Sequence, residues 1–218
     1  MMELPKLVIF DCDGVLVDSV MAHSEVMSDN FARYDLHMSP VEVRDVLGAG
    51  KMSEIGEAAK KLGAKLPDHW LDEIYTEIFD RLRQGVELIP YVKDIVGRVA
   101  DAGIPICVAS NGSVDKMKIM LGSSGLLDMF NDAIFSAHDV KSWKPEPGLF
   151  FHALETMNVD PSDCLVIEDS PTGADAAQRA GIKCLGYAAD TNPSDLTAFD
   201  AHIFHDMRDV PNLIGITS

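Results

Sequence analysis

Residues 7–14 read Leu-Val-Ile-Phe-Asp-Cys-Asp-Gly, and this stretch decides the fold class. Its first half is a short apolar run rich in β-branched residues, which is typical of a strand buried on both faces of a sheet. Its second half places Asp11 and Asp13 directly after that strand, and Gly14 allows a sharp turn beside them. Open parallel sheets bind ligands at the carboxyl ends of their strands. We therefore expect the chemistry of this protein to begin here.

Three further apolar runs of the same kind follow along the chain, and patterns with helical spacing lie between the runs. The runs cover residues 104–109, 164–167 and 183–187, and the clearest helical patterns cover residues 92–100 and 173–180. Alternation of strands and helices predicts an α/β fold. The expected core is a Rossmann-like parallel sheet flanked by helices.

A long insertion interrupts this alternation directly after the first strand. Apolar residues recur at steps of three and four, without a convincing strand, and the connections are short. The predicted helices cover residues 21–34, 40–46, 52–62 and 68–82. The sequence therefore predicts an inserted small α-helical bundle at residues 19–85, and a discontinuous α/β catalytic core made of residues 1–18 and 86–218.

Composition and charge limit the partners that this protein can have. The 218 residues are 47% hydrophobic and 24% charged, as in a soluble globular protein, and the net charge of −17 repels polyanions. We expect no nucleic-acid partner. The first apolar run is too short for a signal peptide or a membrane span, which favours a cytoplasmic protein without a membrane partner. The four cysteines form no CxxC pair and are expected to be reduced, and both a monomer and a homodimer remain open.

Reactive side chains follow three of the four predicted strands. Asp11 and Asp13 follow the first strand, Ser110 and Asn111 the second, and Glu168 and Asp169 the third, while Lys144 lies in a proline-punctuated loop before the third strand. Because the carboxyl ends of parallel strands meet at one edge of a sheet, these groups are expected to converge on one crevice.

The residue types in this set predict phosphoryl-transfer chemistry. Several carboxylates in one crevice need a hard divalent cation, and oxygen ligands favour Mg²⁺. Asp11 can attack phosphorus to form an acyl phosphate, and Asp13 can act as general acid and base. Lys144 supplies a fixed positive charge and Ser110 a hydroxyl donor. The backbone N–H groups at the start of a helix over residues 113–121 can face the same anion.

Four segments, in this order, resemble the motifs of haloacid dehalogenase superfamily phosphatases. They read DCDGVLVDS from Asp11, VASNG from Val108, WKPEPGLF from Trp143 and VIEDSPTGA from Val166, and the resemblance runs over nearly the whole chain. It implies that Asp11 is the nucleophile and Asp13 the acid/base. It also implies metal ligation by Asp11, the backbone carbonyl of Asp13 and Asp169, with Glu168 as a further contributor.

The insertion resembles the small helical cap of β-phosphoglucomutase-like and phosphoglycolate phosphatase-like members of this superfamily. Within that group the motifs look most like those of 6-phosphogluconate phosphatase-like proteins. The cap loop at residues 47–51 reads Leu-Gly-Ala-Gly-Lys, which implies that Lys51 binds substrate. His23 occupies the position of a cap-hinge histidine in mutase-like members. The predicted substrate-binding residues are Ser110, Asn111, Lys144, Lys51 and His23.

These observations favour a Mg²⁺-dependent phosphatase that acts on a small phosphorylated metabolite, such as a sugar phosphate or a sugar-acid phosphate. Two alternatives remain. A β-phosphoglucomutase-like phosphomutase would use the same aspartyl-phosphate, and His23 and the cap loop agree with it. A phosphoacceptor signalling module also places an aspartate at a strand end beside acidic metal ligands, but it does not explain the inserted bundle or Asp13.

Overall fold

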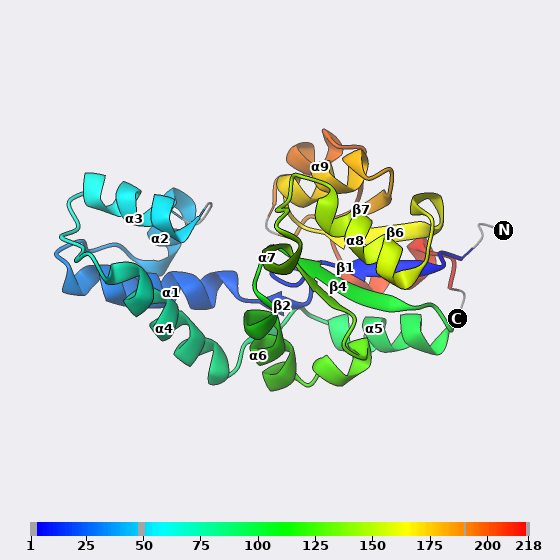
Figure 1. Ribbon diagram of the computed structural model, residues 1–218, viewed down its shortest axis with the longest axis horizontal. Helices are drawn as coiled ribbons and strands as arrows, with labels where there is room; N and C mark the ends of the chain where they lie inside the picture. Colours follow the sequence, from blue (N-terminus) through cyan, green and yellow to red (C-terminus); the bar gives the residue numbers. More distant parts are fainter. Residues whose placement is uncertain (1–3, 48–50, 190, 217–218) are drawn as a thin grey trace. The chain divides into compact units, whose positions relative to one another are not determined.

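The computed structural model describes residues 4–47, 51–189 and 191–216. The chain divides into two compact units, which are named here by their content. The core unit consists of Met1–Val17 and Leu88–Ser218, and the helical unit consists of Asp18–Glu87. Figure 1 shows that the core unit contains the large sheet, whereas the long helices α1 and α4 belong to the helical unit.

The core unit is built on a parallel sheet. In the described part of the chain the sheet has six strands, in the order β5-β4-β1-β6-β7-β8, and every neighbouring pair is parallel. Its strands are β1 (Leu7–Phe10), β4 (Ile106–Ser110), β5 (Ile134–Ser136), β6 (Cys164–Glu168), β7 (Lys183–Tyr187) and β8 (His202–Phe204). The central position of β1, between β4 and β6, explains why all four of its residues are buried. The predicted parallel sheet is confirmed.

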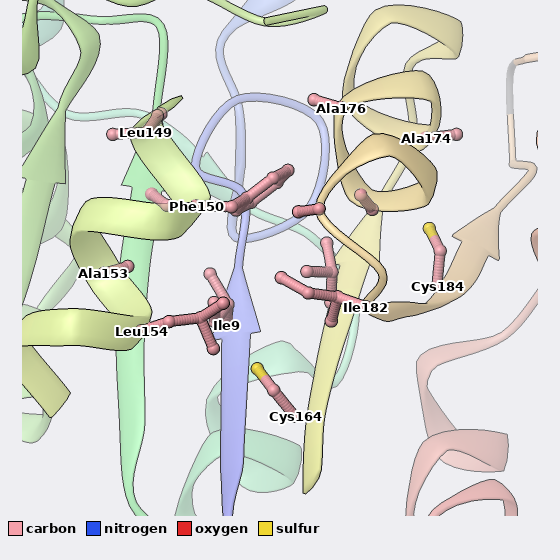
Figure 2. Close-up of a cluster of buried hydrophobic side chains, with 14 of the residues drawn as sticks. Ile9, Leu149, Phe150, Ala153, Leu154, Cys164, Ala174, Ala176, Ile182 and Cys184 are labelled. Carbon is pink, nitrogen blue, oxygen red and sulfur yellow. The ribbon is translucent and has the colours of Figure 1, made fainter. Parts of the chain in front are cut away.

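Helices cover both faces of this sheet because side chains alternate along each strand. Ile9 lies in a buried apolar cluster with residues of α8 and α9, such as Leu154 and Ala176 (Figure 2). Phe10 belongs to the other face, where its ring meets Phe130 edge-on with 6.1 Å between centroids. The longer helices of the core unit are α5 (Val92–Asp101), α6 (Val114–Ser124), α8 (Gly148–Met157) and α9 (Pro171–Arg179). Shorter helices are α7 (Ala137–Val140), η1 (Leu127–Phe130), η2 (Pro161–Asp163), α10 (Pro193–Thr197), η3 (Met207–Asp209) and α11 (Val210–Leu213).

The helical unit contains α1 (Val20–Arg33), α2 (Pro40–Leu47), α3 (Met52–Lys61) and α4 (Trp70–Arg83). Two very short strands, β2 (Val17–Asp18) and β3 (Glu87–Leu88), pair where the chain passes between the two units. The predicted helical insertion is confirmed. Among the described residues, every helix is too short or too polar to cross a membrane.

Two strands of the parallel sheet were not predicted from the sequence, and a third begins two residues later than predicted. β5 and β8 each have three residues, which is too short for a clear apolar pattern, and β8 begins with the exposed His202. The second predicted strand, residues 104–109, instead runs over Ile106–Ser110. Pro105 has no N–H to donate to a neighbouring strand, so regular pairing starts only after it.

The helical unit packs around a buried polar side chain. Asn30 is fully buried, accepts a hydrogen bond of 2.7 Å from the indole nitrogen of Trp70, and donates to Glu73 and Glu77. The Trp70 ring stacks on Phe31, with 5.8 Å between ring centroids and 16° between planes. The contact between Asn30 and Trp70 therefore fixes α1 against α4.

We predict that Asn30→Ala lowers the free energy of unfolding by about 1–3 kcal/mol, because it leaves the buried Trp70 N–H without an acceptor. Trp70→Phe removes that donor, so the double variant is expected to lose less stability than the sum of the two single variants. Urea denaturation of the four proteins measures this coupling. Strict additivity would show that the hydrogen bond does not contribute.

Candidate active site

Three strands of the sheet bring the predicted catalytic residues to one edge. β1 pairs with β4 on one side and with β6 on the other, in parallel register. Asp11 follows the last residue of β1, while Ser110 and Glu168 are the last residues of β4 and β6. The sheet therefore places these three side chains next to one another, although they are about 100 and 60 residues apart in sequence.

Lys144 is the cation at the centre of this edge. Its ammonium group donates to Asp11 Oδ1 at 2.7 Å, to Glu168 Oε1 at 2.5 Å and to the Ala109 carbonyl at 2.8 Å. A lysine ammonium has three N–H donors, so these contacts use its full capacity. The side chain is buried, and its nitrogen lies 5.1 Å from the centroid of the Phe150 ring. The apolar surroundings strengthen the attraction between Lys144 and the two carboxylates.

Glu168 is fully buried and both of its carboxylate oxygens are already bonded. Oε1 accepts from Lys144, and Oε2 accepts from the backbone N–H groups of Asp169 and Ser170 and from the Ser170 hydroxyl. Backbone N–H groups at the start of α9 thus meet a negative charge, as helix N-termini favour. A Cβ at Gly173 would lie 1.9 Å from this carboxylate, so only glycine fits there.

Asn111 holds the segment that carries Lys144. Its side-chain oxygen accepts from the Lys144 backbone N–H at 2.8 Å, and its side-chain nitrogen donates to the Lys144 carbonyl at 3.3 Å. The sequence predicts Asn111 as a substrate-binding residue, and these contacts give its side chain a structural partner. Because the amide binds both the N–H and the carbonyl of Lys144, it fixes the position of the Lys144 backbone, from which the side chain extends.

A serine that was not predicted from the sequence, Ser136, supports the Ser110-Asn111-Gly112 turn. Ser136, the last residue of β5, donates from its hydroxyl to the Gly112 carbonyl at 2.7 Å and accepts from the His138 N–H. Ser110 Oγ in turn accepts from the Gly112 N–H at 3.1 Å. Ser136 could not be predicted because β5 itself was not. The position of Ser136 depends on the pairing between β4 and β5.

Asp169 completes an acidic cluster with Asp11 and Glu168. One carboxylate oxygen from each residue lies within 4.8 Å of the others. The chain turns closely beside Asp169, since Gly14 has φ +79° and a Cβ there would lie 2.0 Å from Asp169 Oδ2. Lys144 contacts two of these three carboxylates, and the oxygen-rich, negatively charged set fits a hard divalent cation.

The electrostatics of the cluster agree with an excess of negative charge. Burial raises the pKa of Asp11 from 3.8 to about 7, against the attraction of Lys144, and Glu168 adds to the rise. Burial also raises the pKa of Asp169 well above its ordinary value, together with the charges of Glu168 and Asp11. Burial alone would lower the pKa of Lys144, but the charges of Asp11 and Glu168 outweigh it and raise that pKa.

Asp13 has a different cation beside it. Lys116 Nζ lies 2.9 Å from Asp13 Oδ1 and 3.0 Å from Oδ2, so it contacts both oxygens. Lys116 is not among the site residues predicted from the sequence, although it lies in the first turn of the helix whose start is expected to face an anion. Its position shortly after the Ser110-Asn111-Gly112 turn was the sequence signal that could have placed Lys116 near the site.

Two predicted substrate-binding residues lie in the helical unit. His23 is half-buried in α1, and Lys51 is exposed and precedes α3. Residues 48–50 of the predicted cap loop lie outside the described residues. A substrate-binding role for His23 and for Lys51 therefore stays a prediction.

We predict that Gly173→Ala lowers the free energy of unfolding by roughly 2–4 kcal/mol. Its methyl group must displace Glu168 and break the buried ion pair to Lys144, and this outweighs the better helix propensity of alanine. The control is Gly122→Ala in α6, where a Cβ would meet only Leu127 at 3.8 Å and stability should rise slightly. Chemical denaturation compares the two, and equal effects would contradict the prediction.

Comparison with known proteins agrees with this arrangement. A family model of haloacid dehalogenase-like hydrolases matches residues 5–181. The 6-phosphogluconate phosphatase of Escherichia coli is 30% identical over 210 residues, which cover 95% of this chain and 94% of that protein.

Solved structures show the same fold. A haloacid dehalogenase-like protein from Agrobacterium tumefaciens has a TM-score of 0.83 and 29% identity, covering 96% of this chain and 97% of that chain. A hydrolase of this family from Deinococcus radiodurans, solved with bound phosphate and sodium, has a TM-score of 0.84 and 24% identity, with 99% of each chain covered. The motifs, the sheet and these matches together show that the chain belongs to the haloacid dehalogenase-like hydrolases.

Proposed function

We propose that this hydrolase is a phosphatase that acts on small phosphorylated metabolites through an aspartyl-phosphate on Asp11. The observation that carries the proposal is the placement of the Asp11 carboxylate. It is almost completely buried, lies at the end of the central strand, and is held at 2.7 Å by Lys144 beside Asp169. A fixed, partly desolvated carboxylate next to a cation is suited to nucleophilic attack on phosphorus.

The reaction then has two steps that share one acid/base. In the first, an Asp11 oxygen bonds to phosphorus while the bond from phosphorus to the leaving oxygen breaks, and the Asp13 carboxyl gives its proton to that oxygen. In the second, a water oxygen bonds to the same phosphorus while the bond from phosphorus to the Asp11 oxygen breaks, and the water gives a proton to the Asp13 carboxylate. Inorganic phosphate leaves, and both aspartates return to their starting states.

Positive charge and donors for the phosphoryl group come from several parts of the edge. We assign the fixed charge to Lys144 and a hydroxyl donor to Ser110, which are both buried at the strand ends. The 11-residue helix α6 begins at Val114, shortly after Ser110, so its N-terminus, which carries the positive end of the helix dipole, lies near Ser110. In a protein with a net charge of −17, such local groups have to provide the attraction for an anion.

We propose that Asp11, Asp169 and the backbone carbonyl of Asp13 hold Mg²⁺. When bound, the ion would offset the charge of the phosphoryl oxygens during transfer. The family resemblance also implies that Glu168 contributes to the metal site. Since both Glu168 oxygens already accept hydrogen bonds, we propose instead that Glu168 keeps Lys144 in place.

The substrate class rests on the relatives and on the helical unit. The 6-phosphogluconate phosphatase of Escherichia coli supports a sugar phosphate or sugar-acid phosphate such as 6-phosphogluconate. We propose Lys51 and His23 as further substrate-binding residues. A phosphomutase would use the same two aspartates, but this relative, matched over nearly the whole of both chains, favours the phosphatase.

Four free, buried cysteines agree with a cytoplasmic location, where thiols stay reduced.

We expect Asp11→Asn to lower turnover at least about a thousandfold, because an amide does not replace the carboxylate nucleophile. The assay is phosphate release from a panel containing 6-phosphogluconate, hexose phosphates and phosphoglycolate, with product analysis by NMR. Asp101→Asn, at an exposed position at the end of α5, is the control and should keep full activity. Normal turnover by Asp11→Asn would refute the aspartyl-phosphate, and an isomerised sugar phosphate as the main product would indicate a mutase.

We further expect Mg²⁺ to stabilise the protein and a chelator to abolish turnover. Magnesium at about 100 times its dissociation constant should add about 2.7 kcal/mol to the free energy of unfolding. Asp169→Asn should remove most of this gain, whereas Asp101→Asn should retain it. Thermal unfolding with and without Mg²⁺ provides the measurement. The same gain in Asp169→Asn as in the wild type would exclude Asp169 as a ligand.

A further inference from the structure

Lys116 and Asp13 form a partly buried ion pair, and Lys116 has no role in the reaction proposed above. The distances from Lys116 Nζ to the two Asp13 oxygens are 2.9 and 3.0 Å, and the two side chains are only 20% and 26% exposed. Partial burial makes such a pair stronger than an ordinary surface ion pair. Contact with both oxygens also restricts rotation of the carboxylate, which a single contact would leave free.

The loop that carries Ser110 also sets the position of Lys116. Ser113 caps α6 by accepting from the Lys116 backbone N–H at 3.3 Å. Gly112 lies between the groups concerned, since a Cβ there would be 3.5 Å from Lys116 Cδ, 3.5 Å from Ser110 Oγ and 3.8 Å from Asp13 Oδ2. Asp13, Ser110 and Lys116 are thus neighbours around one turn.

The buried Lys144 and the partly buried Lys116 contact different aspartates. Lys144 donates to Asp11 and Glu168, whereas Lys116 donates to both oxygens of Asp13. If a cation were needed only to balance charge, either lysine could contact either aspartate. The observed division instead gives the proposed nucleophile and the proposed acid/base separate partners.

We propose that Lys116 is a positioning residue that fixes the orientation of the Asp13 carboxyl toward the leaving-group oxygen. This inference rests on the proposed acid/base role of Asp13. When one Asp13 oxygen carries the proton, the other can still accept from Lys116, so the O–H keeps its direction. As the proton moves to the leaving oxygen and the bond from phosphorus to that oxygen breaks, Asp13 becomes a carboxylate. Both of its oxygens then accept from Lys116, as the structure shows.

Dependence on the leaving group tests this role. An alkyl phosphate needs a proton on its leaving oxygen, whereas p-nitrophenyl phosphate releases a stable anion and needs little help. Lys116→Met should therefore lower kcat/KM about tenfold or more for the best alkyl phosphate of the panel, and less than about threefold for p-nitrophenyl phosphate. The ratio kcat/KM is used because it reports the steps up to departure of the leaving group.

Matched variants separate positioning from general damage. Lys118→Met removes an exposed lysine from the same helix and should change neither value. Lys116→Arg can still contact both oxygens and should restore part of the alkyl phosphate activity. If Lys116→Met does not fold, Lys116→Gln serves for the same comparison. An equal loss on both substrates in Lys116→Met would overturn the inference.

Asp13→Asn distinguishes failure of this inference from failure of the proposed function. If Asp13→Asn loses activity mainly on the alkyl phosphate while Lys116→Met loses both activities equally, Asp13 is the acid and Lys116 does not position it. If Asp13→Asn also affects both substrates equally, the proposed acid role of Asp13 fails, and the positioning role of Lys116 fails with it.

Discussion

The buried ion pairs of Lys144 with Asp11 and Glu168 are the interaction on which the rest of the site depends. A buried ammonium group is costly unless each of its donors has an acceptor, and here two carboxylates and the Ala109 carbonyl provide them. Removing Lys144 would leave the Asp11 and Glu168 carboxylates without a cation in an apolar environment. The neighbouring structure can therefore be understood as a frame that keeps these partners in place.

The residues of that frame either allow the backbone to approach a carboxylate closely or form hydrogen bonds with backbone groups. Glycine is required at Gly173 because the start of α9 lies against the Glu168 carboxylate, and at Gly14 because the chain turns beside Asp169 with a positive φ. Asn111 binds the backbone on both sides of Lys144. The remaining negative charge, shared by Asp11 and Asp169, is what the proposed magnesium ion would balance.

Much of this arrangement could be predicted from local sequence signals. Short apolar runs of four to six residues identified the central strands, and three- and four-residue spacing identified the inserted helices. Three-residue strands give no such signal, so β5 and β8 were missed, and Ser136 with them. Lys116 was missed because a lysine in a first helical turn usually faces solvent. Only the tertiary structure brings Lys116, in α6, to Asp13, which follows β1.

The sequence by itself determined the kind of fold and the chemical types present at the strand ends. Residues 7–14 already contain a buried strand, two aspartates and a permissive glycine, because apolar periodicity and turn chemistry are local properties. The tertiary structure decided which groups become partners. Glu168 meets Lys144 rather than solvent, and Asp13 meets Lys116, because pairing of distant strands sets distances of a few ångströms that no local pattern contains.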